Sequence, residues 1–436
     1  MEQITRVTSK RIEDTYDVIQ HPSGLRIMVY PKPGSHSAFA IFGTKYGSID
    51  TRFRRSDEDA DSEVPAGIAH FLEHKLFENE DCDAFARYAK TGASANAYTS
   101  FDMTCYLFSC TKNLYDSLEI LLDFVQKPYF TEQTIQKEQG IIGQEIRMYE
   151  DDPSWRVLFN LLRAMYHVHP VKTDIAGTVD SIAQITPEML YRCYHTFYNL
   201  HNMVLCLAGN VETEKVLEVA DRMLKPCERV KVERAFLPEP ENIVQPYIEE
   251  EMAVSFPIFQ LGFKETPGVF AEQKDAEVDI LLELLASDAS PLFRRLLDKG
   301  LINESSFGYD HFTGTGYSAI LFSGESKDPK EVSKMICEEA ERLRREGIDP
   351  QAFSRARKAV YGRNIMALNS AEAIANAMTS VTFRGEELFR YIDRVAEVSL
   401  EDVQRCLEEH LLPQHAVLSV ISPKGNEMNI GGNDHD

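Results

Sequence analysis

The chain repeats itself at an interval of about half its length. Residues 181–190 (SIAQITPEML) resemble residues 394–403 (RVAEVSLEDV), and both segments continue through an Arg-Cys pair into an apolar stretch. Thr186 and Ser399, which lie 213 residues apart, each precede an acidic residue in a pattern typical of a helix N-terminus. The interval is far longer than the repeat of a solenoid, so the sequence predicts a duplicated domain.

The duplication predicts two homologous domains joined near the middle of the chain. Residues 235–245 contain two prolines and several polar residues, which is typical of a linker. We therefore predict an N-terminal domain at residues 1–234 and a homologous C-terminal domain at residues 246–422. Residues 423–436 are polar and contain glycine, so we expect a loose tail there.

Local patterns predict several elements of the first half. We expect strands at residues 16–20, 26–30, 38–46 and 203–209. Apolar residues at helical spacing predict a helix at residues 113–125, and residues 131–149 are expected to form a long helix. Residues 51–63 are dense in charge, which predicts an exposed loop.

Composition excludes several classes of protein. The net charge of −23 argues against nucleic acid and anionic membranes as partners. It fits either a solvated acidic surface or a cavity that prefers basic peptides. No apolar run approaches the length of a membrane helix. The first residues lack a basic start followed by an apolar run, so we expect no secretory signal. The eight cysteines are scattered without a Cys-x-x-Cys pair, so we expect reduced thiols and a cytoplasmic location.

A five-residue motif, HFLEH at residues 70–74, points to a metal. Each helical residue advances by about 100°, so His70, Glu73 and His74 share one face. Two imidazoles at i and i+4 can chelate one zinc ion, and the glutamate can hold a water beside it and accept its proton. The order H-x-x-E-H is the inverted form of the zinc-peptidase motif H-E-x-x-H. The alternative is a helix with two surface histidines and an ion-pairing glutamate.

A catalytic zinc site needs a third protein ligand and one open position. The predicted helix at residues 131–149 offers Glu138 and Glu145, which are seven residues apart and therefore lie on one helical stripe. One of them can bind the metal while the other supports the site from outside the ligand set. From the residues alone, both can also be solvent-exposed glutamates on an acidic helix.

The motifs together resemble those of the pitrilysin-type metallopeptidases, which include insulin-degrading enzyme and the mitochondrial processing peptidase. The resemblance covers nearly the whole chain, and the length fits half-size bacterial members similar to the processing-peptidase subunits. It rests on residues 67–74 (GIAHFLEH), 138–145 (EQGIIGQE), 96–99 (NAYT), 104–106 (TCY), 169–170 (HP), 177–178 (GT) and 197–199 (FYN).

The resemblance implies an α+β fold of two homologous domains, each a mixed, mostly antiparallel sheet packed by helices, which form half of a clam-shell. It implies His70, His74 and Glu145 as zinc ligands, Glu73 as the general base and Glu138 as the support of the ligand set. The second half has no His-x-x-Glu-His, and alignment of residues 362–365 with residues 143–146 puts an asparagine at the ligand position.

The resemblance also implies that a strand formed by Asn96, Ala97, Tyr98 and Thr99 binds the substrate. An edge strand can accept an extended peptide through backbone pairing, a mode that tolerates many side chains. On residue type alone, Asn96 is an ordinary turn residue.

One segment departs from the family. Catalytic members usually carry an arginine and a tyrosine in the second half that hold the substrate and the tetrahedral intermediate. In this chain Leu297 stands at the arginine position and the tyrosine is missing, with Arg295 or Tyr309 as the available substitutes. We expect another subunit to supply these groups.

Two functions remain open at this stage. The first is a zinc-dependent endopeptidase that hydrolyses peptides or unfolded segments, bound as an added strand inside a dimeric chamber. Its partner would be an identical chain or a related subunit that supplies the arginine and tyrosine. The alternative is a non-catalytic or partner-dependent assembly subunit that retains the peptidase fold.

Overall fold

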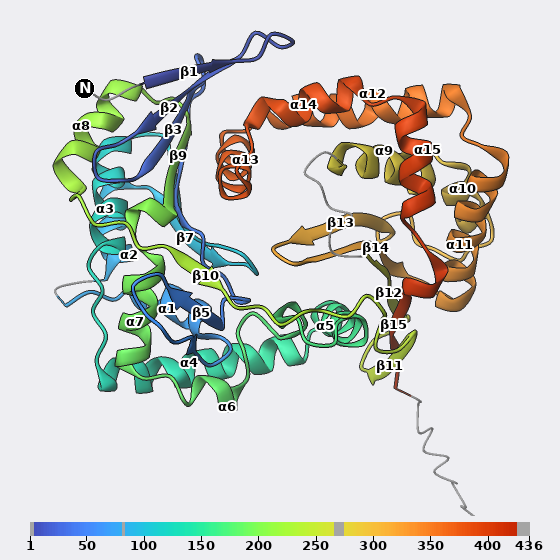
Figure 1. The fold of residues 1–436 in the computed structure, drawn as a ribbon, viewed down its shortest axis with the longest axis horizontal. Helices are drawn as coiled ribbons and strands as arrows, with labels where there is room; N and C mark the ends of the chain where they lie inside the picture. The colour runs from blue at the N-terminus through green and yellow to red at the C-terminus, as the bar shows by residue number, and fades with distance from the viewer. Residues whose placement is uncertain (1–3, 81–82, 266–273, 425–436) are drawn as a thin grey trace, which may run out of the picture.

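The computed structural model describes residues 4–80, 83–265 and 274–424. Two sheets, each packed by helices, form the two halves of the molecule (Figure 1). This confirms the predicted α+β fold. The predicted tail at residues 423–436 lies outside the described residues beyond its first two.

The first half contains a seven-stranded sheet in the order β1-β2-β3-β9-β4-β8-β7. Neighbouring strands are antiparallel except β3 and β9, which are parallel. The strands are β1 (Ile4–Thr8), β2 (Thr15–Gln20), β3 (Arg26–Pro31), β4 (Ala38–Thr44), β7 (Ser94–Thr99), β8 (Thr104–Cys110) and β9 (Met203–Gly209).

The second half contains a five-stranded sheet in the order β11-β15-β12-β14-β13. Its one parallel pair is β11 with β15. The strands are β11 (Tyr247–Met252), β12 (Ile258–Lys264), β13 (Gly308–Gly314), β14 (Tyr317–Glu325) and β15 (Ala416–Pro423).

The two sheets share one strand order. The series β3-β9-β4-β8-β7 matches β11-β15-β12-β14-β13, and the parallel pair stands at the same place in both. Strands β9 and β15 follow the two copies of the sequence repeat. The predicted caps are present, because the Thr186 hydroxyl accepts the N–H of Met189 and the Ser399 hydroxyl accepts that of Asp402. The duplication read from the sequence is therefore a duplication of the fold.

The charged stretch at residues 51–63 is not a simple loop. It forms β5 (Arg52–Arg55) and β6 (Ser62–Glu63), and β5 also pairs with β10 (Val232–Arg234) in a small third sheet. Phe53 is fully buried and anchors this hairpin in the core. One apolar side chain among charged neighbours is a weak signal, so the strand was missed in the sequence.

Helices cover both sheets, and the two predicted helices of the first half are present as α3 and α4. The helices of the first half are α1 (Ile68–Leu76), α2 (Ala84–Thr91), α3 (Leu114–Val125), α4 (Glu132–Glu150), α5 (Pro153–Met165), α6 (Val179–Ile182), α7 (Pro187–Phe197) and α8 (Thr213–Met223), with 3-10 turns η1 (Pro170–Lys172) and η2 (Leu200–Asn202). Those of the second half are α9 (Asp275–Ala286), α10 (Pro291–Asp298), α11 (Pro329–Glu346), α12 (Pro350–Ala367), α13 (Ala371–Arg384), α14 (Leu388–Glu397) and α15 (Leu400–Glu409), with η3 (Pro413–His415).

Each half contributes one helix that packs on the sheet of the other half, an arrangement called here the helix exchange. Helix α5 of the first half packs on β12 and β15 of the second sheet, and α13 of the second half packs on β4 and β9 of the first sheet (Figure 1). Each exchange builds a buried apolar cluster, with Leu161 and Met165 against Leu321 in one and Met378 against Ile41 in the other. Burial of such side chains stabilises the fold by about 1.5–3 kcal/mol each. The halves are therefore joined by their cores as well as by the chain.

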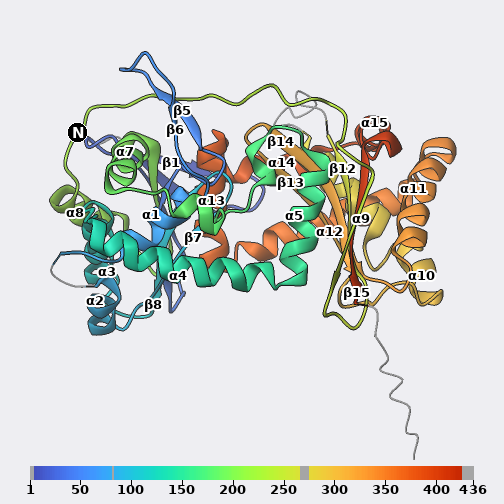
Figure 2. The same ribbon diagram turned by 90° about the horizontal axis from the view of Figure 1, so that it is seen from below.

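The predicted linker crosses between β10 and β11 as an extended segment (Figure 2). Its Glu239 accepts three backbone N–H groups, from residues 167–169, at 2.8 Å each. The same carboxylate pairs at 2.7 Å with Lys264, and the two side chains are only 4% and 1% exposed. The segment is thus held at its centre by a buried ion pair.

The part of the chain that the structure describes contains no helix that is both long and apolar enough to cross a membrane. Seven cysteines among these residues are free thiols, as expected from their scattered positions.

Candidate metal centre

Helix α1 carries both motif histidines and begins at a glycine. Gly67 has a φ of 88°, and a Cβ at this position would lie 2.3 Å from the carbonyl oxygen of Ala176. A side chain would be strained there and would also clash, so glycine sets the start of the helix. Phe71 is fully buried on one side of α1, while His70 and Glu73 on the other side are 8% and 7% exposed. Both faces of α1 are therefore buried against other parts of the protein.

Helix α4 brings the two predicted glutamates to α1. It begins with a capping box in which the Thr131 hydroxyl accepts the N–H of Thr134 at 3.3 Å. Glu138 and Glu145 lie two turns apart, and both side chains face the motif histidines. The predicted stripe on one helix is thus present.

His70, His74 and Glu145 come together with a spacing that suits one metal ion. The Nε2 atoms of His70 and His74 each lie 3.6 Å from a different oxygen of Glu145. These distances exceed a hydrogen bond. A tetrahedral ion with bonds of 2.0–2.1 Å places its ligand atoms about 3.3–3.5 Å apart. The distances between the three side chains are therefore close to those between ligands of one zinc ion and too long for direct hydrogen bonds.

The other histidine atoms agree with this fit. Nδ1 of His74 lies 3.0 Å from Oε1 of Glu138, which leaves Nε2 of the same ring to face Glu145. A carboxylate on the outer nitrogen orients a metal-ligating histidine. Burial, followed by the charge of His74, lowers the pKa of His70 to about 3, so its ring is neutral at ordinary pH. A neutral imidazole is the form that binds a metal.

Glu73 lies beside the three residues with a separate partner. Its Oε2 accepts the Thr99 hydroxyl at 2.7 Å. Burial raises the pKa of Glu73 above its ordinary value, and the Thr99 hydrogen bond opposes this rise. A buried carboxylate with a raised pKa is a stronger base than an exposed one. Sequence reasoning placed Thr99 in a substrate strand and did not connect it with Glu73.

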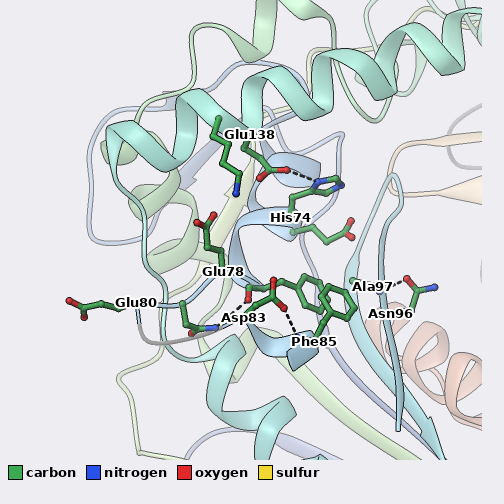
Figure 3. Close-up of a pocket in the computed structure, with 12 residues that line it drawn as sticks. His74, Glu78, Glu80, Asp83, Phe85, Asn96, Ala97 and Glu138 are labelled. Atoms are coloured by element: carbon green, nitrogen blue, oxygen red, sulfur yellow. Dashed lines mark hydrogen bonds and ion pairs between the residues drawn. The ribbon is translucent and has the colours of Figure 1, made fainter. Parts of the chain in front are cut away.

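Strand β7 is one of the two edge strands of the first sheet and lies next to α1. Its side chains alternate between two faces. Ala97 and Thr99 face the side of α1, whereas the Tyr98 hydroxyl donates to Oδ1 of Asn376 on α13 at 3.1 Å. Asn96 turns back on its own strand, where Oδ1 accepts the N–H of Ala97 at 2.9 Å (Figure 3). Within the predicted substrate strand, the Tyr98 side chain thus points toward α13 of the second half and not toward α1.

A cavity of about 610 Å³ lies between α1, β7 and α4 and reaches Glu73, His74 and Glu138 (Figure 3). Phe77 and Phe85 form its apolar wall, with stacked rings 4.5 Å apart. Sequence reasoning did not single out these two residues. Phe77 follows His74 by three positions, and this helical spacing is the signal that places it beside the motif.

The second half does not reproduce this group of candidate ligands. The predicted counterpart of Glu145 is Asn364 on α12, whose side-chain amide donates to the carbonyl of Val360 in its own helix at 2.9 Å. Across the described residues, no other group of three histidine, cysteine or carboxylate side chains lies close enough to share an ion. Arg295, which the sequence offered as a substitute for the family's arginine, pairs with Glu339 at 2.6 Å.

Comparisons with known proteins agree with this geometry. Residues 59–179 match the family model described as insulinase, peptidase family M16, and residues 184–360 match the peptidase M16 inactive domain. The chain is 39% identical to the uncharacterised zinc protease YmfH of Bacillus subtilis over 97% of this chain and 100% of that protein.

Solved structures show the same fold. A putative M16-like peptidase from Alicyclobacillus acidocaldarius has a TM-score of 0.89 and 34% identity, over 97% of this chain and 99% of that one. Pitrilysin has a TM-score of 0.74 at 17% identity, with 97% of this chain matching 46% of pitrilysin. The expected resemblance to the half-size pitrilysin-type proteins is confirmed, and the chain belongs to peptidase family M16, the insulinase family.

Proposed function

We propose that this protein is a zinc-dependent endopeptidase that hydrolyses peptides held as an added strand on β7. The proposal rests on one observation. The Nε2 atoms of His70 and His74 each lie 3.6 Å from an oxygen of Glu145, a spacing that suits one metal ion, and the buried Glu73 lies beside them. The zinc-protease names of the relatives support it. Zn²⁺ held by these three residues supplies a Lewis acid that polarises the peptide carbonyl and lowers the pKa of water.

Glu73 is the general base in this mechanism. Thr99 donates to Oε2 and fixes the orientation of the carboxylate, which leaves Oε1 to accept a proton from the attacking water. The same group then returns the proton to the nitrogen of the leaving amine. Proton transfer by one positioned side chain typically contributes about 10²–10⁴-fold to the rate.

The substrate strand follows from the position of β7. An edge strand offers unpaired backbone N–H and C=O groups, so an extended peptide can pair with it and pass the metal centre. The aromatic wall of Phe77 and Phe85 lines the same cavity as Asn96 and Ala97. We expect this mode to accept many sequences, because the backbone supplies most of the recognition.

The clamp for the tetrahedral intermediate is supplied by a partner subunit in this proposal. Arg295 is bound to Glu339, and the Tyr309 hydroxyl donates to Glu283 at 2.8 Å. Figure 1 shows α10, which carries Arg295, at the end of the molecule away from α1. The partner is either a second copy of this chain or a related subunit, and the active form is a dimer that encloses the chamber.

The test of the catalytic role uses Glu73→Gln, with Glu63→Gln as the matched control on the exposed strand β6. Zinc content is measured together with hydrolysis of a peptide library. We expect Glu73→Gln to retain zinc and lose about 10²–10⁴-fold in rate, and the control to match wild type. Hydrolysis by Glu73→Gln at the wild-type rate would contradict the proposal.

The test of the partner role compares the purified chain with the chain mixed with extract of the source cells. Fractions are separated by size, and activity is assigned to each. We expect activity in the dimeric fraction. Full activity in a monomeric fraction would contradict the need for a partner.

A further inference from the structure

Two hairpin turns, one from each half, meet in the middle of the molecule. Strands β7 and β8 are joined by residues 100–103, and strands β13 and β14 by residues 315–316. The two hairpins stand at the same place in their sheets, since β8-β7 matches β14-β13 in the strand order. Figure 1 shows them pointing toward one another. The contact therefore joins the proposed substrate strand to the half that does not contain the candidate ligands.

Asp102 makes this contact with both of its carboxylate oxygens. Its Oδ1 accepts the backbone N–H of Thr315 at 3.0 Å, and its Oδ2 accepts the hydroxyl of Tyr317 at 2.8 Å. Gly314 permits the approach, because a Cβ there would lie 2.2 Å from Oδ2 of Asp102. Asp102 and Thr315 are 213 residues apart, which is the interval of the sequence repeat. The bonds thus link corresponding turns of the two halves.

His169 holds the turn of the second half on another side. Its Nε2 lies 3.1 Å from the carbonyl oxygen of Thr315, and its Nδ1 accepts the N–H of Val171 at 3.2 Å. Because Nδ1 is the acceptor, the proton of the neutral ring is on Nε2, which donates to Thr315. Burial lowers the pKa of His169, so the ring stays neutral. The motif at residues 169–170, which the family resemblance singled out, thus has a structural role.

A short stretch of backbone connects Asp102 with the general base. Thr99, the last residue of β7, precedes Asp102 by three positions and donates its hydroxyl to Oε2 of Glu73 at 2.7 Å. Among the described strands, β7 is hydrogen-bonded only to β8, and its last pair is Thr99 with Thr104. An edge strand has backbone partners on one side only, so its end opens more easily than that of a central strand. The position of Thr99 therefore depends on the turn that follows it.

The first half supports the same turn through its backbone. The N–H groups of Ser48 and Ile49 donate to the carbonyls of Ser100 and Phe101, at 3.0 and 3.2 Å. The bonds of Asp102 come from the second half instead. The turn is thus held by both halves together.

We propose that Asp102 is a positioning residue of the peptidase site. By anchoring the β7–β8 turn to the β13–β14 turn of the second half, it holds Thr99 against Glu73 and keeps the general base aligned. This role rests on the proposed function. It gives the half without the candidate ligands a part in catalysis, because that half fixes the end of the strand that contacts the base.

Alignment of the base affects the chemical step. A general base must lie within hydrogen-bond reach of the proton that it abstracts. A misplacement of about 1 Å, caused by a change far from the chemistry, can cost about 100-fold in rate. A purely structural role of Asp102 would lower the fraction of folded protein and would leave kcat of the folded protein unchanged.

Four variants separate these roles. Asp102→Ala removes both bonds. Asp102→Asn can keep both, since its amide oxygen can accept the N–H of Thr315 and its amide N–H can donate to the hydroxyl oxygen of Tyr317. Tyr317→Phe removes one bond and keeps the ring. Tyr391→Phe is the matched control, because it removes a tyrosine–aspartate bond of the same kind, to Asp279, within the second half.

Two measurements are made on the full-length protein. Peptide hydrolysis, assayed in the active size fraction and normalised to the amount of folded protein, gives kcat and KM. Hydrogen exchange of the backbone amides of residues 94–99 reports on β7 without any assay of activity.

We expect Asp102→Ala to lower kcat by about 10–100-fold, with KM close to that of wild type and faster exchange in β7. Tyr317→Phe should show a smaller loss of the same kind, because one of the two bonds remains. Asp102→Asn should recover most of the wild-type kcat. Tyr391→Phe should match wild type in both measurements.

The role is overturned if Asp102→Ala keeps the wild-type kcat or the wild-type exchange of β7, or if Tyr391→Phe loses as much activity. An Asp102→Asn variant as slow as Asp102→Ala would also contradict it. If wild type hydrolyses peptides and Asp102→Ala does so equally well, the proposed function stands and this role alone fails. A wild type that hydrolyses no peptide overturns the proposed function and this role together.

Discussion

Gly43 and Gly262 occupy the same position in the two halves of the molecule. Gly43 on β4 pairs with Val204 of β9, and Gly262 on β12 pairs with Val417 of β15. The two valines are separated by the same 213 residues as the repeat in the sequence. The duplicated sheets therefore keep a glycine where each receives a helix.

Each glycine allows an exchanged helix to lie directly on the sheet. A Cβ on Gly43 would lie 3.2 Å from the side chain of Thr379 on α13, and a Cβ on Gly262 would lie 2.6 Å from that of Met165 and 2.9 Å from that of Leu161 on α5. The helix lies closer to the glycine at Gly262 than at Gly43, so we expect Gly262 to be the more sensitive to a larger residue.

Gly262→Val should therefore destabilise the protein. The added branched side chain meets α5 in a packed core, and overpacking of this kind typically costs 1–3 kcal/mol. Urea denaturation measures the free energy of unfolding. Gly362→Ala is the control, because a Cβ there meets no atom within 4 Å and alanine stabilises a helix interior by about 0.8–1 kcal/mol. A neutral or stabilising Gly262→Val would contradict the close-packing account of the exchange.

Glu239→Gln should also lower the free energy of unfolding, by about 3–5 kcal/mol, since it leaves Lys264 buried without its ion-pair partner. The neighbouring Glu241→Gln is the control, because Glu241 is exposed on the same segment. Thermal and urea unfolding at neutral pH compare the two variants. Equal stability of both would show that the segment between the halves is a passive connection.

The same carboxylate makes a pH-dependent contribution to stability. Burial alone would raise the pKa of Glu239, but the hydrogen bonds from Lys264 and the backbone lower it from about 4.5 to about 2. The folded pKa lies below the unfolded one, so the contribution is complete above pH 4.5 and is lost as the pH falls toward 2. It amounts to about 3 kcal/mol. The stability difference between wild type and Glu239→Gln should therefore shrink as the pH is lowered over this range.

Two residues of β7 should separate binding from stability. Tyr98→Phe removes the hydrogen bond to Asn376, so we expect a loss of about 0.5–1.5 kcal/mol in stability and an unchanged KM. Asn96→Ala should leave stability nearly unchanged and raise KM, because Asn96 lines the cavity beside the metal centre. Peptide kinetics and urea denaturation of both variants provide the measurement. The reverse pattern would place the substrate contact at Tyr98 and not at Asn96.

Removal of the metal should lower the unfolding temperature. At free Zn²⁺ about 100-fold above Kd, binding to the folded state contributes about 2.7 kcal/mol. A chelator should abolish this stabilisation in wild type, and Glu145→Gln should show little dependence on zinc from the start. Glu150→Gln, at the exposed end of α4, is the control. An identical response of the two variants to the chelator would exclude Glu145 as a ligand.

The predictable part of this protein depends on local patterns. The motif at residues 70–74, the long helix with Glu138 and Glu145 and the repeated segments were all evident from spacing, because backbone hydrogen bonds and side-chain periodicity act over a few residues. Strand β5 was missed because Phe53 is its one fully buried residue and because its partner β10 lies about 180 residues away.

The sequence by itself determined which residue types can hold a metal, which half contains them and that the fold is duplicated. Tertiary structure alone decided that α5 and α13 change places, that Tyr98 reaches Asn376 and that Thr99 reaches Glu73. These contacts join residues that are far apart along the chain. They arise from the packing of two sheets and their helices into common cores, and no short-range pattern encodes that packing.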